Sequence, residues 1–255
     1  MIKACIADIE RSATHDGPGL RTTVFFKGCP LSCEWCHNPE CIDFKTQVLC
    51  YPQKCIGCGE CDKGCFAGAK VVCGKNMTVD EVYREIELDK DYYGYTGGVT
   101  FSGGEPFAQK EFLNAIIDRC NCENISCAVE TSMIYYDEEI LKKLQLIMCD
   151  LKIWDSEIHK EYTGVPNEKI KENIIKANKL GIPIIVRTPV VPEIDQGIDK
   201  ISEFVKGLKN VKQYELLPYH PLGQDKRIAL GMQPDGFTVP DKTTMEELKK
   251  YVFIR

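Results

Sequence analysis

The chain has 255 residues, of which 44% are hydrophobic and 27% are charged, and its formal net charge is −6. This length allows one α/β barrel-like domain or two small domains, and the composition is that of an ordinary globular protein. No basic stripe suits a nucleic-acid surface, no apolar run reaches about twenty residues, and the charged N-terminus does not read as a signal peptide. We therefore expect a cytoplasmic protein that binds neither nucleic acid nor membrane.

Short β-rich segments alternate with amphipathic segments along the chain. Each β-rich segment is bounded by turn residues, as buried parallel strands are. The predicted strands are Thr22–Cys29, Gly97–Gly104, Ile125–Thr131, Leu146–Lys152, Ile182–Val191 and Val211–Tyr219. The predicted helices, which have apolar residues at spacings of three and four, are Met77–Glu87, Gln109–Cys120, Glu138–Leu144, Asn167–Leu180, Ile198–Leu208 and Lys242–Tyr251.

This repeat of strand and helix predicts right-handed crossovers and a parallel sheet. Six strands are too few for a closed eight-stranded barrel. They favour a partial, open (β/α)6 TIM-like barrel over residues 1–255, with the chemistry on loops at the carboxyl ends of the strands. Residues 38–75 are rich in cysteine and glycine and do not fit the repeat. We interpret them as an insertion.

The cysteines depart from the ordinary composition. There are 15, and ten of them lie from Cys29 to Cys73. A disulfide framework would require an oxidising compartment and is typical of short secreted chains. In a reducing cytoplasm, closely spaced cysteines indicate metal binding instead.

Cys29, Cys33 and Cys36 directly follow a predicted strand, so they lie on a loop at its carboxyl end. Three thiolates can bind three corners of a cubane iron–sulfur cluster, which takes four protein ligands when fully ligated. The missing ligand leaves one iron open, as expected of a catalytic metal. The alternative is zinc with Cys41 as the fourth ligand, although this spacing is unusual for zinc.

A second run, Cys55, Cys58, Cys61 and Cys65, has the spacing of bacterial ferredoxins, with Phe66 in place of the usual proline. In two-cluster ferredoxins the last cysteine of a run serves the other cluster. The fourth ligand here is therefore open, with Cys65 first and Cys73, Cys50 and Cys41 as rivals. The insertion is one cysteine short of two full clusters, which predicts a single auxiliary cluster. A zinc ribbon is the alternative.

Six motifs, in order along nearly the whole chain, give the sequence a family resemblance. They are DGPGLR (Asp16–Arg21), WCHN (Trp35–Asn38), GGVTFSGGEP (Gly97–Pro106), MCDLK (Met148–Lys152), IVRTPVVP (Ile185–Pro192) and ELLPYH (Glu215–His220). With the cysteine triad, the chain resembles the glycyl-radical-enzyme activating enzymes of the radical S-adenosylmethionine (SAM) superfamily. The pyruvate formate-lyase activating enzyme, which lacks a ferredoxin-like insert, is the best-known member.

The resemblance implies a radical SAM partial barrel and a reaction. A catalytic [4Fe-4S] cluster would cleave SAM reductively, and a hydrogen atom would then be abstracted from a glycine Cα of a partner glycyl radical enzyme. The expected electron donor is a flavodoxin or a ferredoxin, and we expect a monomer. The auxiliary cluster would relay electrons toward the catalytic cluster or, as the second choice, serve partner docking. Cofactor and cluster would do the chemistry, while the protein binds, orients and excludes side reactions.

The resemblance also implies roles for individual residues. Asp16 belongs to a loop expected to order around the partner's glycyl peptide. Glu130 stands where the pyruvate formate-lyase activator has an aspartate beside a monovalent cation, together with Thr131, Met148 and Asp150. The implied SAM-binding residues are Trp35, Cys36, His37, Ser102, Gly103, Gly104, Glu105, Glu130, Asp150, Leu151, Lys152, Arg187 and His220.

Other polar and thiol residues are expected to be structural. His159, in a helical stretch, is predicted to face solvent. The buried small hydrophobes would include Cys5, Cys120, Cys122, Cys127 and Cys149. Two rival functions remain: a radical SAM enzyme acting on a small molecule or on anaerobic ribonucleotide reductase, and a ferredoxin-like electron-transfer module.

Overall fold

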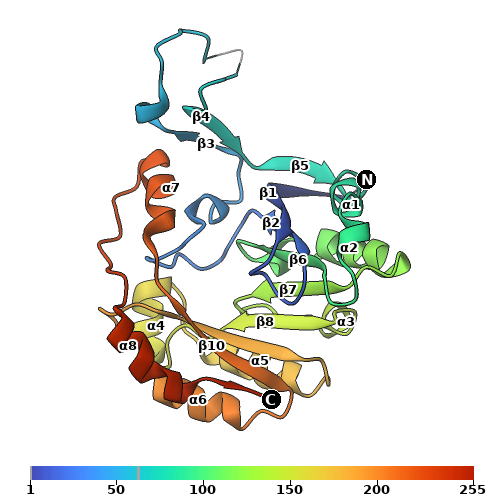
Figure 1. Ribbon diagram of the computed structural model, residues 1–255, viewed down its shortest axis with the longest axis vertical. Helices are drawn as coiled ribbons and strands as arrows, with labels where there is room; N and C mark the ends of the chain where they lie inside the picture. Colours follow the sequence, from blue (N-terminus) through green and yellow to red (C-terminus); the bar gives the residue numbers. More distant parts are fainter. Residues whose placement is uncertain (1, 62–63) are drawn as a thin grey trace.

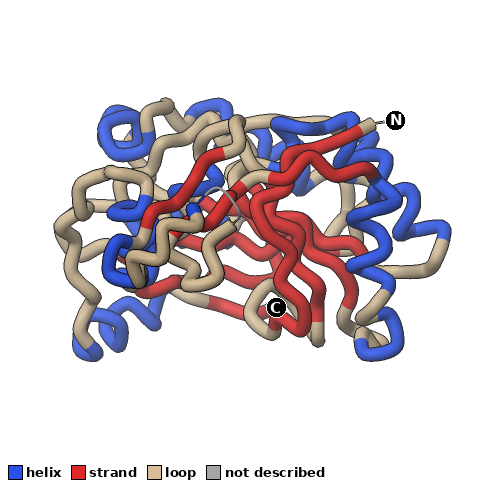
Figure 2. Tube along the Cα trace, turned by 90° about the horizontal axis from the view of Figure 1, so that it is seen from above, coloured by secondary structure: helices blue, strands red, loops and turns tan. Residues whose placement is uncertain are grey.

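A nine-stranded, mostly parallel sheet forms the centre of the molecule (Figure 1). The computed structural model describes residues 2–61 and 64–255. The strand order is β11-β10-β9-β8-β7-β6-β2-β1-β5. In Figure 2 the strands gather in the interior, with helices and loops around them. Among the described residues, no helix is long and apolar enough to cross a membrane.

Six neighbouring strands of this sheet run parallel, as the sequence predicts. They are β2 (Arg21–Phe26), β6 (Gly98–Gly103), β7 (Cys127–Thr131), β8 (Leu146–Asp150), β9 (Ile184–Val190) and β10 (Val211–Pro218). The helices of the repeat are α1 (Val79–Glu87), α2 (Lys110–Cys122), α3 (Glu138–Leu141), α4 (Ser156–Thr163), α5 (Glu168–Asn178) and α6 (Ile198–Lys206). The predicted partial barrel is therefore confirmed.

Three antiparallel strands at the sheet's edges are absent from the sequence prediction. They are β1 (Lys3–Ala13), β5 (Lys75–Thr78) and β11 (Phe253–Ile254). The first two extend the sheet beyond β2, and β11 follows α8 (Lys242–Leu248) and pairs with β10. The alternation in β1 is hidden because half of it is solvent-exposed and charged.

Side chains alternate between the two faces of the strands. On one face, Phe26 lies edge-on to Phe101 and to Phe112 of α2, with ring centroids 6.2 and 6.0 Å apart. On the other face, Thr23 and Thr100 are buried, and their hydroxyls bond to Asp16. The apolar face therefore packs against helices, and the opposite face gives the barrel a polar interior.

Residues 38–75 leave this pattern, as expected. They contain a two-stranded hairpin of β3 (Gln47–Cys50) and β4 (Lys70–Cys73), which projects away from the barrel beside α7 (Gln224–Ala229) (Figure 1). The ends of this insertion as a separate unit remain a prediction.

A buried lysine connects the root of the insertion to the barrel. Lys27 directly follows β2 and is fully buried. Its ammonium donates to the carbonyl oxygen of Glu40 and, at 2.9 Å, to Oε1 of Gln47 on β3. Buried cations are rare without a paired carboxylate, and no ion pair joins Lys27 to a carboxylate in the described ranges. This contact fixes β3 to the loop that begins at Gly28.

Two expectations about structural residues were wrong. His159 is buried rather than solvated, since Nδ1 lies 2.6 Å from the carbonyl oxygen of Val165 and 3.0 Å from Oγ1 of Thr163. Burial lowers the pKa of His159. Cys122 is exposed because it ends α2 on the solvent side, and Cys5 is only partly buried. The remaining three predicted core thiols, Cys120, Cys127 and Cys149, are buried.

Candidate cofactor site at the carboxyl ends of the strands

The loop after β2 carries the three predicted ligand cysteines. Main-chain hydrogen bonds hold it on two sides: Ser32 and Glu34 donate to carbonyls at the end of α4, and Cys29 donates to the carbonyl of Ile42, at 2.9–3.1 Å. The side chain of Cys33 is buried, and those of Cys29 and Cys36 are partly buried. The three thiols therefore sit on one loop whose course is fixed by its neighbours.

Burial governs the protonation of these thiols. It raises the pKa of Cys29 and Cys33, and it raises the pKa of Cys36 to about 12. Lys152 opposes the rise at Cys33 and Cys36. Burial alone would lower the pKa of Lys152, but Asp150 and Cys33 outweigh it and hold that pKa above its ordinary value. A permanent cation thus accompanies thiols that would become thiolates on binding metal.

The donor set of this loop fits an iron–sulfur cluster. Thiolate is the protein ligand of such clusters. Three thiols share the loop, Leu31 and Trp35 pack against them, and the partly buried ammonium of Lys152 offsets thiolate charge. In residues 2–61 and 64–255, no three cysteine, histidine or acidic side chains converge on a single-ion site.

The SGGEP turn ends β6 beside this loop. Gly103 has φ +105°, which favours glycine, and a Cβ on Gly104 would lie 2.5 Å from the carbonyl oxygens of Gly28 and Cys41. Glu105 N–H donates to the Gly28 carbonyl at 2.9 Å. The two glycines therefore let the turn approach the root of the cysteine loop closely.

The carboxylate of Glu105 is placed differently from the expected contact with a cofactor amino group. It is fully buried and accepts hydrogen bonds from the hydroxyl of Thr131 at 2.8 Å and from the N–H and hydroxyl of Ser132 at 2.9 and 2.6 Å. Burial raises the pKa of Glu105, and these donors oppose the rise. Its oxygens are occupied, so the side chain orders the loop after β7.

A chain of charged side chains lines the polar interior from β6 to β9. Ser102 donates to Glu130 at 2.5 Å, and Arg187 Nη1 donates to the other Glu130 oxygen at 2.8 Å. Arg187 Nε lies 3.5 Å from Asp150, which pairs with Lys152 at 2.6 Å. Burial alone would raise the pKa of Asp150, but Lys152 and Arg187 hold it below its ordinary value. The predicted Ser102, Glu130, Asp150, Lys152 and Arg187 are thus brought together.

Two predicted histidines also meet. The rings of His37 and His220 stack edge-to-face with centroids 4.3 Å apart. Burial, with further contributions from His220 and Lys226, lowers the pKa of His37 to about 4, so its ring is neutral at pH 7. Leu151 points the other way, into the apolar core, as the alternation of β8 requires.

The loop containing Asp16 folds over the interior from the opposite ends of the strands. Thr23 donates to the Asp16 carboxylate at 2.6 Å. Beneath it, Arg21 is buried and donates to Oγ1 of Thr100 at 2.6 Å and to the carbonyls of Val99 and Ser126. The sequence analysis did not identify Arg21 as the residue that anchors this loop. Its place at the end of the DGPGLR motif could have indicated that role.

The geometry above is that of a known superfamily. The sequence profile described as the Radical SAM superfamily matches residues 23–205, which contain the cysteine loop and the charged interior. The chain belongs to the radical SAM superfamily. As a radical SAM protein it is 36% identical to the (2S)-3-sulfopropanediol dehydratase activating enzyme of Klebsiella oxytoca, over 89% of this chain and 85% of that relative. It is 34% identical to the 4-hydroxyphenylacetate decarboxylase activating enzyme of Clostridioides difficile strain CD196, over 96% and 90%.

Solved structures agree with this radical SAM fold. A domain of pyruvate-formate lyase-activating enzyme from Bacteroides vulgatus is 31% identical, with a TM-score of 0.51 over 61% of this chain and 92% of that one. SuiB of Streptococcus suis, bound to precursor peptide SuiA, has a TM-score of 0.61 over 88% of this chain and 42% of its own, at 16% identity. The latter likeness shows the fold alone.

Proposed function

We propose that this radical SAM protein activates a glycyl radical enzyme by abstracting a hydrogen atom from a glycine Cα of that partner. The observation that carries the proposal is the loop of three buried or partly buried thiols beside the charged interior of the barrel. The relatives support it, since they are activating enzymes of a dehydratase and a decarboxylase, and a further one of an isethionate sulfite-lyase.

We assign Cys29, Cys33 and Cys36 as ligands of a catalytic [4Fe-4S] cluster. With SAM bound, such a cluster supplies the electron that cleaves the sulfonium. The chain's own part is to hold the ligands and to exclude water, since Leu31 and Trp35 wall the loop and protect a reactive species from side reactions.

SAM is a zwitterion with a sulfonium, and the interior offers both signs of charge. Lys152 and Arg187 can meet its carboxylate, and Glu130 and Asp150 can meet its cationic groups. The neutral ring of His37 and the ring of His220 stacked against it stand beside the cysteine loop and can contact the nucleoside. Glu105 acts as a positioning residue, because its carboxylate is bonded within the protein.

Anaerobic reconstitution with iron, sulfide, dithionite and SAM tests the reaction. We expect 5′-deoxyadenosine to form, and an electron paramagnetic resonance doublet of a glycyl radical to form when the cognate partner is added. Absence of 5′-deoxyadenosine from protein carrying a full catalytic cluster would contradict the proposal and would favour the electron-transfer module.

Asp16→Ala should separate partner activation from SAM cleavage. The Asp16 carboxylate bonds to Thr23 in the interior and contacts none of the three thiols. We expect the rate of glycyl radical formation to fall at least about tenfold, because the variant loses roughly one charge-assisted hydrogen bond. Formation of 5′-deoxyadenosine without partner should stay unchanged. Equal loss of both would contradict a role in the partner's placement.

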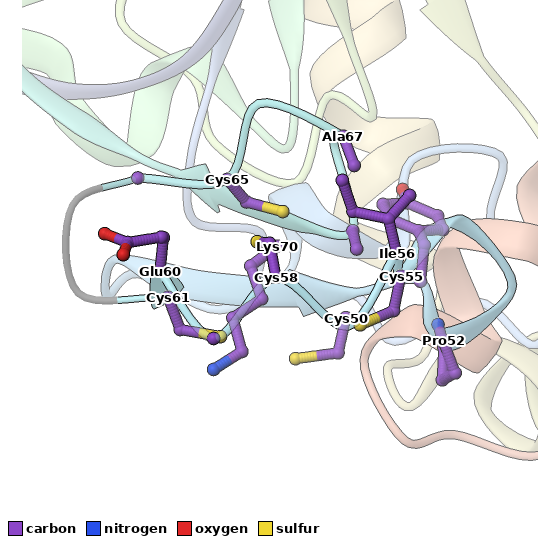
Figure 3. Close-up of a pocket in the computed structure, with 14 residues that line it drawn as sticks. Cys50, Pro52, Cys55, Ile56, Cys58, Glu60, Cys61, Cys65, Ala67 and Lys70 are labelled. Carbon is purple, nitrogen blue, oxygen red and sulfur yellow. The ribbon is translucent and has the colours of Figure 1, made fainter.

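We further propose one auxiliary [4Fe-4S] cluster in the insertion. Figure 3 shows the pocket concerned, with thiols arranged around one space. The cysteines that line it are Cys50, Cys55, Cys58, Cys61 and Cys65. The two rival ligands Cys41 and Cys73 are buried elsewhere and do not line it. Main-chain N–H groups of Lys70 and Ala69 lower the pKa of Cys65, which supports it as the fourth ligand.

Iron content tests the auxiliary ligands. In protein whose catalytic triad is replaced by serine, we expect roughly four iron atoms per chain, as one cubane holds. Adding Cys58→Ser should remove them. Adding Cys73→Ser instead, as a matched control in the same hairpin, should leave them. Iron that survives Cys58→Ser, or zinc in place of iron, would contradict the assignment.

The remaining proposals concern charge and assembly. A monovalent cation beside Glu130 has to compete with Ser102 and Arg187, which already occupy both carboxylate oxygens. We expect a cation to occupy this site only if bound SAM draws Arg187 away from Glu130. Titrations of SAM affinity with sodium and with potassium would reveal this.

We further propose that a flavodoxin or a ferredoxin supplies the electron, and that the protein is a cytoplasmic monomer.

A further inference from the structure

One face of the β3–β4 hairpin is covered by the protein itself. Leu49 of β3 and Cys73 of β4 are buried and pack with Ala229 of α7. Because side chains alternate along a strand, this contact fixes which face of the hairpin points outward. It also anchors the hairpin against a helix that follows the last parallel strand.

Among the residues that the structure describes, the opposite face of the hairpin is exposed to solvent. Val48 pairs with Val72 across the hairpin, and Cys50 pairs with Lys70, so these four residues share the outer face. The two valines are 48% and 68% exposed, although a valine is usually buried in a sheet. Cys50 and Lys70 also line the thiol pocket, so the exposed face runs into the proposed auxiliary site.

Two further large apolar side chains near the pocket are exposed. Ile56 lines the pocket and is 74% exposed, and Phe66 next to Cys65 stands entirely in solvent. We call the set Val48, Cys50, Ile56, Phe66, Lys70 and Val72 the hairpin face. Exposed apolar side chains gathered in this way mark a surface that another molecule covers.

The charge of this region is opposite to that of the chain. The insertion, residues 38–75, carries five lysines and four acidic residues, a net charge of +1, whereas the whole chain carries −6. In the part of the chain that the structure describes, no carboxylate lies within ion-pair distance of Lys45, Lys54, Lys70 or Lys75. Lys54 lies over the Tyr51 ring, 4.4 Å from its centroid. The hairpin face is therefore apolar, with a rim in which lysines outnumber acidic side chains, and Glu60 also lines the pocket.

We propose that the hairpin face docks an acidic one-electron carrier protein. The inference rests on the proposed auxiliary cluster and deepens it by naming the surface through which electrons enter. One electron would leave the reduced carrier and reduce the auxiliary cluster, and no bond would form or break. The excess of lysines in the rim steers an acidic partner, and the apolar side chains supply the contact.

The position of the face favours a carrier over the glycyl radical enzyme. A glycyl segment has to reach the interior of the barrel, where Asp16 and the cysteine loop lie. The pocket cysteines other than Cys65 are exposed (Figure 3), and the hairpin that carries them projects away from that interior (Figure 1). A cluster so near solvent is suited to exchange electrons with an outside protein.

Binding of oxidised flavodoxin, measured anaerobically by isothermal titration calorimetry on protein reconstituted with its clusters, tests the proposal without turnover. Lys54→Glu with Lys70→Glu should weaken binding about tenfold or more at low salt, and the difference should shrink at high salt. Val72→Glu offers a second variant that leaves every lysine and cysteine in place. The matched control is Lys206→Glu with Lys209→Glu, on and after α6 at the opposite end of the molecule.

Iron content and dithionite reduction establish that each variant keeps its clusters. Unchanged flavodoxin affinity in both face variants would overturn the proposal, as would an equal loss in the control. Weaker binding of the glycyl radical enzyme with flavodoxin unaffected would assign the face to that partner instead. Failure of the proposed function is distinguishable, because it would appear as missing auxiliary iron or missing 5′-deoxyadenosine in the unaltered protein.

Discussion

Cys36→Ser should abolish SAM cleavage while leaving a folded protein. Serine is close in size to cysteine but is a poor ligand for iron, so the catalytic cluster should lose one of its three corners. We expect 5′-deoxyadenosine to fall below detection and roughly four iron atoms per chain to be lost. Iron analysis and electron paramagnetic resonance of the reduced protein measure both.

Cys149→Ser is a matched control for this prediction. Cys149 is a buried thiol on β8 that lies on the apolar side of the sheet, in the core shared with the helices. Its replacement should cost stability yet retain both iron and SAM cleavage. Retention of the catalytic cluster in Cys36→Ser, or its loss in Cys149→Ser, would show that the cluster is held elsewhere.

Glu105→Ala should be the most destabilising substitution at the site. It leaves the hydroxyls of Thr131 and Ser132 and the Ser132 N–H buried without their acceptor. Removing one partner of such a buried charged network costs about 3–5 kcal/mol. For a chain of this size that corresponds to a fall of about 10 °C in apparent Tm. Anaerobic differential scanning fluorimetry measures it.

Glu111→Ala is the control for Glu105→Ala, because Glu111 is exposed in the first turn of α2. Its effect should stay within about 0.5 kcal/mol. If Glu105 instead bound SAM directly, Glu105→Gln would weaken SAM affinity without altering Tm. That outcome would restore the role that the sequence predicts for this carboxylate.

Much of the barrel could be predicted from sequence because its parallel strands are short apolar runs between glycines and amphipathic helices. Arg187 and Lys152 could be placed near each other, since the predicted strands that contain them run parallel in one sheet. For His37 and His220 the prediction came from the motifs that contain them, because no periodicity predicts the contact between their rings.

Other features depend on packing that a pattern does not encode. Strand β1 alternates buried with exposed charged residues, so its apolar signal is weak. Glu105 was expected to face a cofactor, but its direction is decided by Thr131 and Ser132, which are distant in sequence and meet it only in the fold. His159 was expected in solvent because its helix is mostly polar, yet the turn at Val165 covers it.

The burial of Lys27 restricts how the insertion can move relative to the barrel. Its ammonium, enclosed between the root of the insertion and the strand that leads into the cysteine loop, donates to Gln47 and to the carbonyl oxygen of Glu40, and it has no other hydrogen-bond partner among residues 2–61 and 64–255. Swinging the hairpin away would strand this charge in a low-dielectric interior, at a cost of several kcal/mol. The hairpin and the start of the cysteine loop therefore move as a rigid unit, so the separation between the two proposed iron–sulfur sites would be set at folding rather than adjusted during turnover.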